Sequence, residues 1–153
     1  MKKLFLLLAA ISLFASCSKD DNPSSETEYE TITNIDQLAG TWKLNAKTNS
    51  GSSTNTATAC DLQYGKFVFS ASVVENRGFS DVSGCSDQSY TYSSASIASG
   101  QLVLIRSGTE TKYYLKKSGG SLWITKYSTL TSGSPTPVII PTGSQVTNYY
   151  IKQ

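Results

Sequence analysis

Histidine is absent from the 153-residue chain, and this absence excludes more chemistry than any other feature of the composition. Histidine is the side chain that most often transfers protons near neutral pH and most often ligates metals. Serine or cysteine nucleophiles activated by histidine are therefore excluded, as are histidine-based metal sites. The sequence also contains no calcium-binding loop or phosphate-binding glycine motif. We therefore expect no enzyme, no metal and no cofactor.

Charged residues are scarce as well. They make up 16% of the chain, and 13 Lys and Arg against 11 Asp and Glu give a net charge of +2. A nucleic-acid-binding protein needs a clustered face of Lys and Arg, so nucleic acid is not an expected partner. At about 100 to 200 residues per domain, the length allows one domain with one core.

Hydrolytic chemistry has little support in the remaining residues. Serine is abundant, but the Gly-x-Ser-x-Gly elbow of serine hydrolases does not occur. Asp81 and Asp87 lie on either side of Cys85 and are the candidate carboxylates for a glycosidase pair. Solvation of a polar loop explains both carboxylates more simply, and we favour that interpretation.

The N-terminus has the composition of an export signal. Met1 and two lysines precede residues 4–15, which are apolar except for Ser12. A bilayer-spanning helix needs about 20 apolar residues, so this segment is too short to cross a membrane. It has the length of a signal-peptide core, and we predict that residues 1–16 are a signal peptide.

The residues that follow carry two resemblances. Phe14-Ala15-Ser16-Cys17 resembles the lipobox of bacterial lipoproteins, and residues 18–22 (Ser-Lys-Asp-Asp-Asn) resemble the signal that exports lipoproteins of the Bacteroidota to the cell surface. The resemblances imply that Cys17 carries a lipid and that the protein is anchored in the outer membrane, facing the outside. The alternatives are the periplasmic face, cleavage near Ala15 without lipidation, and an ordinary tether in residues 18–22. Residues 17–33 are polar and acidic, and we expect them to be a tether.

From Thr31 onward the chain reads as a series of short strands. Apolar and polar residues alternate between clusters of Gly, Ser, Asn and Pro, which is typical of half-buried antiparallel strands. Turns of two or three residues join the later strands, which predicts an up-and-down meander. A helical turn at residues 34–40, with Asn34 as its N-cap and Gly40 as its stop, precedes the first strand. The expected strands are residues 41–47, 65–70, 73–79, 90–97, 101–106, 109–117, 121–128 and 144–152.

Eight strands fit either a closed barrel or a two-sheet sandwich. An immunoglobulin-type sandwich places a tryptophan between two cysteines, but neither Trp42 nor Trp123 lies between Cys60 and Cys85. A closed barrel removes the exposed edges of the sheet. We therefore predict an all-β, eight-stranded, antiparallel up-and-down barrel over residues 34–153.

The start of this region resembles a known family. Residues 38–44 (Leu-Ala-Gly-Thr-Trp-Lys-Leu) resemble the Gly-x-Trp start of lipocalins, and are most similar to the small lipocalin-like domains of Bacteroidota lipoproteins. The final strand, ending in residues 149–152, is also similar. The resemblance implies a lipocalin-like barrel in which Gly40 permits a tight entry into the first strand. It also implies that Trp42 plugs one end of the barrel.

Two cysteines remain once Cys17 is assigned to the lipid. Cys60 and Cys85 lie in polar stretches beside strands, and exported proteins form disulfides. The pair lacks the CxxC spacing of redox and metal sites, so we predict a structural disulfide. The two cysteines are 25 positions apart. A disulfide that closes a loop of this length stabilises the fold by about 3 kcal/mol, if the effect is the lost entropy of the unfolded chain.

Aromatic side chains on the strands allow two interpretations. They either line a pocket in which tyrosine hydroxyls orient a small apolar or amphipathic ligand, or fill the barrel. If they line a pocket, we expect a binding protein with a cavity of a few hundred cubic ångströms. If they fill the barrel, we expect a surface interaction module or a structural module with an exposed apolar patch. In residues 121–128 the sequence does not decide which face points inward. The pocket candidates are Phe67, Phe69, Tyr90, Tyr92 and Tyr113, joined by Trp123 and Tyr127.

One segment interrupts the meander. Residues 138–140 (Val-Ile-Ile) are enclosed by Pro135, Pro137 and Pro141. Proline cannot donate a hydrogen bond to a neighbouring strand, so we expect a stiff extended loop. The loop either acts as a lid or partner contact, or covers part of the core.

Overall fold

The computed structural model describes residues 27–71, 73–80 and 84–153. The predicted signal peptide, the lipidation site Cys17, the start of the tether and Asp81 lie outside these ranges. None of the helices in the described ranges is long and apolar enough to cross a membrane.

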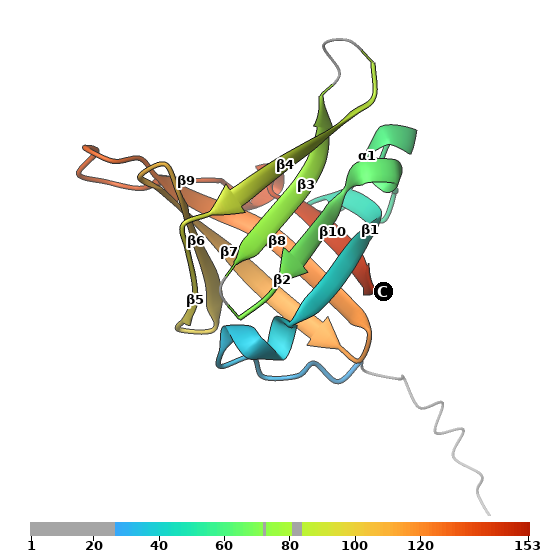
Figure 1. The fold of residues 1–153 in the computed structure, drawn as a ribbon, viewed down its shortest axis with the longest axis horizontal. Coiled ribbons are helices and arrows are strands. Elements are labelled where there is room, and N and C mark those ends of the chain that lie inside the picture. Colours follow the sequence, from blue (N-terminus) through green and yellow to red (C-terminus); the bar gives the residue numbers. More distant parts are fainter. Residues whose placement is uncertain (1–26, 72, 81–83) are drawn as a thin grey trace, which may run out of the picture.

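A single antiparallel sheet curves into a nearly closed barrel (Figure 1). Its strands are β1 (Gly40–Asn49), β2 (Lys66–Phe69), β3 (Val74–Ser80), β4 (Ser86–Tyr92), β5 (Ser94–Ala98), β6 (Gln101–Arg106), β7 (Thr109–Ser118), β8 (Ser121–Leu130), β9 (Val138–Ile139) and β10 (Val146–Lys152). Three short helices accompany them: η1 (Ile35–Leu38), α1 (Ala59–Tyr64) and η2 (Thr142–Ser144). The predicted all-β antiparallel barrel with an N-terminal helical turn is confirmed.

The strand order shows how the barrel closes. It runs β4-β3-β2-β1-β10-β8-β7-β6-β5, with β9 paired to β8, and the predicted meander of β5 to β8 is present. The two outermost strands of this order, β4 and β5, follow each other in the chain and are separated by Ser93 alone. The Ser93 amide donates to the Ile105 carbonyl at 2.8 Å, which ties this corner to β6. The edges of the sheet therefore meet at Ser93.

The sheet has ten strands rather than the eight predicted. The segment expected at residues 90–97 forms two strands, β4 and β5, because the chain bends at Ser93. The proline-rich segment was expected to be an unpaired loop, but β9 pairs with Ser128 and Thr129 of β8. This pairing is possible because Val138 and Ile139 retain the amide hydrogens that proline lacks.

One end of the barrel is closed by η1. Asn34 and Gln37 form a capping box, and Ala39, rather than Gly40, caps the other end of the helix. Gly40 already belongs to β1 and has a φ of +123°, a backbone conformation that residues other than glycine rarely adopt. Trp42 is completely buried, and its Nε1 donates to the Leu38 carbonyl at 2.6 Å. The indole therefore fixes η1 across the barrel end.

The apolar core fills the half of the barrel next to η1. Alternate residues of a strand share a face, so one face of each strand supplies the interior. The buried cluster consists of Ile32, Leu38, Trp42, Leu44, Phe67, Phe69, Val74, Leu102, Leu104, Leu122, Ile124 and Tyr150.

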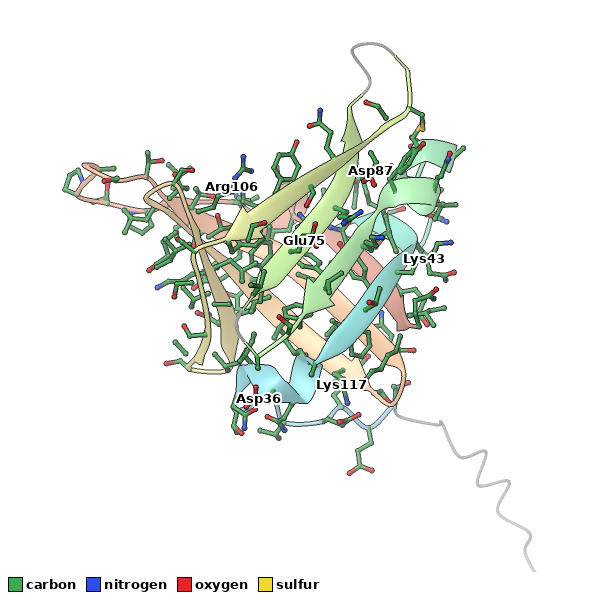
Figure 2. The ribbon with its side chains drawn as sticks, viewed as in Figure 1. Asp36, Lys43, Glu75, Asp87, Arg106 and Lys117 are labelled. Atoms are coloured by element: carbon green, nitrogen blue, oxygen red, sulfur yellow. A yellow bond between two sulfur atoms is a disulfide. The ribbon has the colours of Figure 1, made fainter. Side chains whose placement is uncertain are left out.

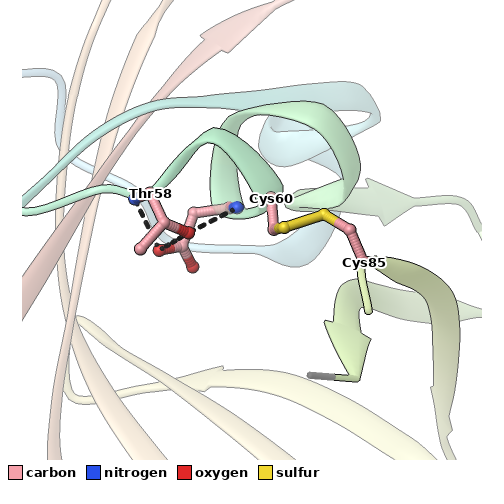
Figure 3. Close-up of a disulfide and its surroundings, with 4 residues drawn as sticks. Thr58, Cys60 and Cys85 are labelled. Carbon is pink, nitrogen blue, oxygen red and sulfur yellow. Dashed lines mark hydrogen bonds between the residues drawn. A yellow bond between two sulfur atoms is a disulfide. The ribbon is translucent and has the colours of Figure 1, made fainter. Parts of the chain in front are cut away.

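The predicted disulfide joins Cys60 to Cys85 and is confirmed (Figure 3). The polar stretch that contains Cys60 forms a short helix, α1, whose N-terminus is capped by Thr58. Cys85 comes directly before β4. The bridge therefore fixes α1 to the start of a strand that lies at one edge of the sheet.

Candidate functional site

The interior changes from apolar to polar along the strands. On β6, Leu102 and Leu104 lie in the core, and the next residue on the same face is Arg106. On β8, Leu122 and Ile124 are followed in the same way by Lys126. The half of the barrel farther from η1 is therefore lined by polar and charged side chains.

A cavity of about 410 Å³ occupies this polar half. We call it the mouth cavity, and its lining residues come from β4, β6, β7 and β8 and from the turn between β6 and β7. It is lined by Tyr92, Arg106, Ser107, Thr109, Thr111, Tyr113 and Lys126. Of the seven aromatic residues considered for a pocket, Tyr92 and Tyr113 line it.

Arg106 spans the gap between β6 and β4 (Figure 2). The centre of its guanidinium group lies 4.2 Å from the ring centroid of Tyr90, within the range of a cation–π contact. The Tyr90 hydroxyl donates to Gln88 Oε1 at 2.7 Å. Tyr90 therefore holds Arg106 beside the mouth cavity without being one of its lining residues.

The hydroxyls of Tyr113 and Tyr150 stay protonated at physiological pH because their pKa values are raised. Burial raises the pKa of Tyr113, and the neighbouring Tyr92 hydroxyl raises it further. Burial likewise raises the pKa of Tyr150, deeper in the barrel. Protonated phenols donate hydrogen bonds, so Tyr113 can present a donor to a bound molecule.

The lining of the mouth cavity carries positive charge only. It contains Arg106 and Lys126 and no carboxylate. Within the described ranges, the ion pairs are Lys47–Asp61, Arg77–Glu75, Arg77–Asp87, Lys112–Glu110 and Lys117–Glu30. Neither cation of the cavity takes part in these pairs.

Phe67 and Phe69 lie in the core instead of lining the mouth cavity. Each side chain is 2% exposed, and their rings stack with a centroid distance of 5.5 Å. Phe67 also packs edge-on against Tyr150. These two pocket candidates therefore fill the closed half of the barrel.

Trp123 and Tyr127, the other two aromatic candidates, lie on the outside of the barrel. The inward face of β8 carries Leu122 and Ile124, so these two aromatic side chains point outward. Trp123 packs against Tyr29 and Tyr149, with ring centroids 5.6 and 5.0 Å away. Tyr127 stacks on a second outward residue, Tyr114, at 4.4 Å.

These outward aromatic residues form a second surface. We call Tyr29, Tyr114, Trp123, Tyr127 and Tyr149 the outer aromatic wall. Beside it lies a groove of about 350 Å³ whose lining includes Tyr29, Tyr114, Trp123, Lys116, Thr125 and Thr147. Tyr114 is 48% exposed, so part of the wall is open to solvent.

Asp87, one of the two carboxylates considered for a glycosidase pair, lies in an ion-pair network. Asp87 pairs with Arg77, which also pairs with Glu75 on the outer side of β3 and β4 (Figure 2). Hydrogen bonds from Ser89 and Arg77 lower the pKa of Glu75, so this carboxylate stays ionised. No group of three or more metal-ligating side chains occurs in residues 27–71, 73–80 and 84–153.

Asp61 lies in the first turn of α1, and its carboxylate has a structural role there. Burial alone would raise the pKa of its carboxyl group, but hydrogen bonds from Thr58 and Lys47 outweigh burial and lower it. The Thr58 amide donates to Asp61 Oδ2 at 2.9 Å, and Lys47 Nζ lies 3.2 Å from the same oxygen (Figure 3 shows the cap). The carboxylate therefore caps α1 and binds it to β1.

The sequence interpretation missed Arg106 and Lys126, which give the mouth cavity its charge. The alternation of the strands could have identified them, because each lies two residues beyond an apolar residue that faces inward.

Compared with known proteins, the chain matches no family model, no curated protein and no solved structure. The mouth cavity and the outer aromatic wall are therefore the features that bear on its function.

Proposed function

We propose that this protein is an outer-membrane lipoprotein whose lipocalin-like barrel binds a small amphipathic molecule in the mouth cavity without catalysing a reaction. The observation that carries the proposal is the cavity itself, of about 410 Å³. Small-molecule sites generally measure about 300 to 1,000 Å³ and combine apolar surface with a few polar groups. The rings of Tyr92 and Tyr113 supply apolar surface, and Thr109 and Thr111 supply hydroxyls.

The filled half of the barrel limits the size of the ligand. Leu104 and Trp42 are completely buried and Phe67 is nearly so. These core side chains fill the space that a deeply bound ligand would need. A molecule bound at the mouth therefore has to be compact. A long acyl chain does not fit this proposal.

The proposal of an anchor rests on the resemblance around Cys17, and the structure describes the other end of the tether. The Glu30 amide donates to the Lys117 carbonyl at 2.8 Å, and the Glu30 carboxylate pairs with the Lys117 ammonium and accepts from the Gly119 amide at 2.8 Å. A hydrogen bond from Lys117 lowers the pKa of Glu30. These contacts hold the described end of the tether at the η1 end of the barrel.

Native mass spectrometry of the full-length protein, purified from its own membrane, tests ligand binding. We expect a small molecule to remain bound to the wild-type protein. Thr109→Trp places an indole in the mouth cavity and should remove that molecule. Thr125→Trp introduces the same group at the groove beside the outer aromatic wall and is the matched control. Retention of the molecule by T109W, or its loss only in T125W, would contradict the proposal.

The outer aromatic wall favours a second candidate function, docking of a protein partner. Tyrosine and tryptophan are enriched in protein interfaces. Val138 and Ile139 on β9 add apolar surface, with 70% and 57% exposure, so neither covers the core. A photo-reactive residue at Tyr114 should then cross-link one protein in native membranes, whereas one at Thr109 should not. Equal labelling from both positions would argue against docking at the wall.

A further inference from the structure

We propose that the mouth cavity selects anions: its ligand is a compact aromatic or alicyclic acid whose ring packs against Tyr92 and Tyr113 and whose acidic oxygens pair with Arg106 and Lys126. This inference rests on the proposed binding function and names the chemical class of the ligand. It follows from the positions of the two cations, their lack of carboxylate neighbours in the lining, and the depth of the cavity.

The two cations approach the cavity from opposite sides of one strand. Arg106 is on β6 and Lys126 is on β8, and both strands pair with β7. In register, Arg106 lies opposite Thr109, and Lys126 lies opposite Tyr113. Because cross-strand partners share a face, these side chains all point to the same side of the sheet as Thr111. An anion above β7 would therefore meet positive charge from both sides and hydroxyls beneath it.

Both cations remain able to bind an acid. The carbon of the Arg106 guanidinium group lies over the Tyr90 ring, and this cation–π contact does not use the N–H groups as hydrogen-bond donors. Lys126 has an exposed side chain that lines the cavity. Two like charges with no carboxylate in the lining repel each other, and a bound anion relieves that repulsion. A cationic ligand would increase it.

The depth of the cavity selects against long ligands. The residues that follow Arg106 and Lys126 toward η1 on the same faces, Leu104 and Ile124, are 0% and 1% exposed. An apolar group can reach the rings of Tyr92 and Tyr113 but not the core beneath them. The ring of the ligand therefore lies beside the tyrosines, close to its acidic group.

Three naphthalene compounds of similar size, each with a different polar group and charge, test the inference. Naphthoate is anionic, naphthylmethanol is neutral and naphthylmethylamine is cationic. Their dissociation constants for the full-length protein would be measured by isothermal titration calorimetry. We expect naphthoate to bind about tenfold more tightly than the alcohol, since charge-assisted hydrogen bonds are the stronger ones, and the amine to bind most weakly.

Single substitutions identify the residues responsible. Arg106→Gln and Lys126→Gln should each weaken naphthoate binding about tenfold and change binding of the alcohol by less than about twofold. Lys126 is exposed, so K126Q keeps the test valid if R106Q fails to fold. Lys116→Gln removes the same charge beside the outer aromatic wall and should leave naphthoate binding unchanged.

The possible failures separate the two proposals. Equal affinities for naphthoate and naphthylmethanol, unaltered by R106Q and K126Q, would overturn anion selection and leave binding in the mouth cavity intact. Equal weakening by K116Q and K126Q would also overturn it, because net charge would then explain the effect. Failure of all three compounds to bind the wild-type protein would overturn both proposals.

Discussion

At the closed end of the barrel, Trp42 connects two elements that follow each other in the chain. Its indole is buried in the core, and its Nε1 reaches back to the carbonyl of Leu38 in η1. A buried carbonyl that loses its donor is costly because water cannot replace the hydrogen bond. The stability of this end therefore depends on one side chain in two ways, through packing and through hydrogen bonding.

Trp42→Phe should lower the free energy of unfolding by about 2 kcal/mol, from the lost hydrogen bond and the space left by the smaller ring. Urea denaturation would measure this change. Trp123→Phe makes the same substitution on the outer aromatic wall and should cost less than about 1 kcal/mol, because this indole lies outside the core. Equal losses in the two variants would contradict the role of Trp42 as a buried plug.

Asp61 gives a pH-dependent contribution. Its carboxyl pKa is lowered in the folded protein from the ordinary value of 3.8, so its stabilising effect is complete above that value and is lost as the pH falls through the lower folded pKa. Asp61→Asn should cost about 1 kcal/mol at pH 7, the usual scale for a helix cap. The difference from wild type should shrink below about pH 4.

Thermal unfolding at a series of pH values would follow this difference. Asp36→Asn on the exposed side of η1 is the control and should change stability little at any pH. A gap between D61N and wild type that stayed constant down to about pH 2 would show that the carboxylate charge is not the cause.

Among the elements, α1 shows why a short helix escapes sequence analysis. It has six residues and none of its side chains is buried, so it carries no apolar periodicity. Its formation depends on the cap between Thr58 and Asp61 and on the disulfide at Cys60, which are contacts rather than patterns. The two cysteines left after Cys17 predicted the bridge but not the helix that it holds.

Removing that bridge should loosen α1 and destabilise the barrel. The double variant Cys60→Ser with Cys85→Ser should lose about 3 kcal/mol, because the unfolded chain is no longer restricted. Urea denaturation would measure the loss, and reduction of the wild-type protein should reproduce it. If the double variant kept wild-type stability, the contribution of the bridge to the fold would be negligible.

The strands were largely predictable and their interruptions were not. Alternation gave β6 its bounds and most of β1, β7 and β8. The break at Ser93 has no glycine or proline to mark it, because it is a corner imposed by closure of the sheet on β6. On β8 the register shifts opposite Lys112 and Tyr113, an irregularity that depends on the partner strand. Strict alternation along β8 nevertheless places Lys126 on the inward face with Leu122.

For the whole molecule, the mouth cavity and the tether lie at opposite ends. Thr109 begins β7 at the cavity, and Ser118 ends it beside Lys117, which binds Glu30 (Figure 2 labels Arg106 and Lys117 at the two ends). Ten residues at about 3.3 Å each separate the two ends by about 30 Å. An anchor at Cys17 would then turn the mouth cavity away from the membrane.

Fluorophores attached to T109C and S118C in the lipidated protein would test this orientation in vesicles that contain a headgroup quencher. We expect stronger quenching at position 118 than at position 109, because the tether leaves from that end. Unlabelled cysteine variants that keep the wild-type unfolding midpoint would serve as the folding control. Equal quenching at the two positions would show that the barrel has no fixed orientation.

The place of β10 in the strand order also bears on how the chain folds. Strands β1 to β4 and β5 to β8 each pair with neighbours in sequence, whereas β10 pairs with β1 and brings Trp42 opposite Lys152. Contacts between distant residues carry the larger loop-closure entropy and form slowly. We expect pulsed hydrogen exchange to show protection of β5 to β8 before protection of β1 and β10, and simultaneous protection would refute this order. On this order, the pairing of β10 with both β1 and β8 is the late step that joins β1 to β4 with β5 to β8 in one curved sheet.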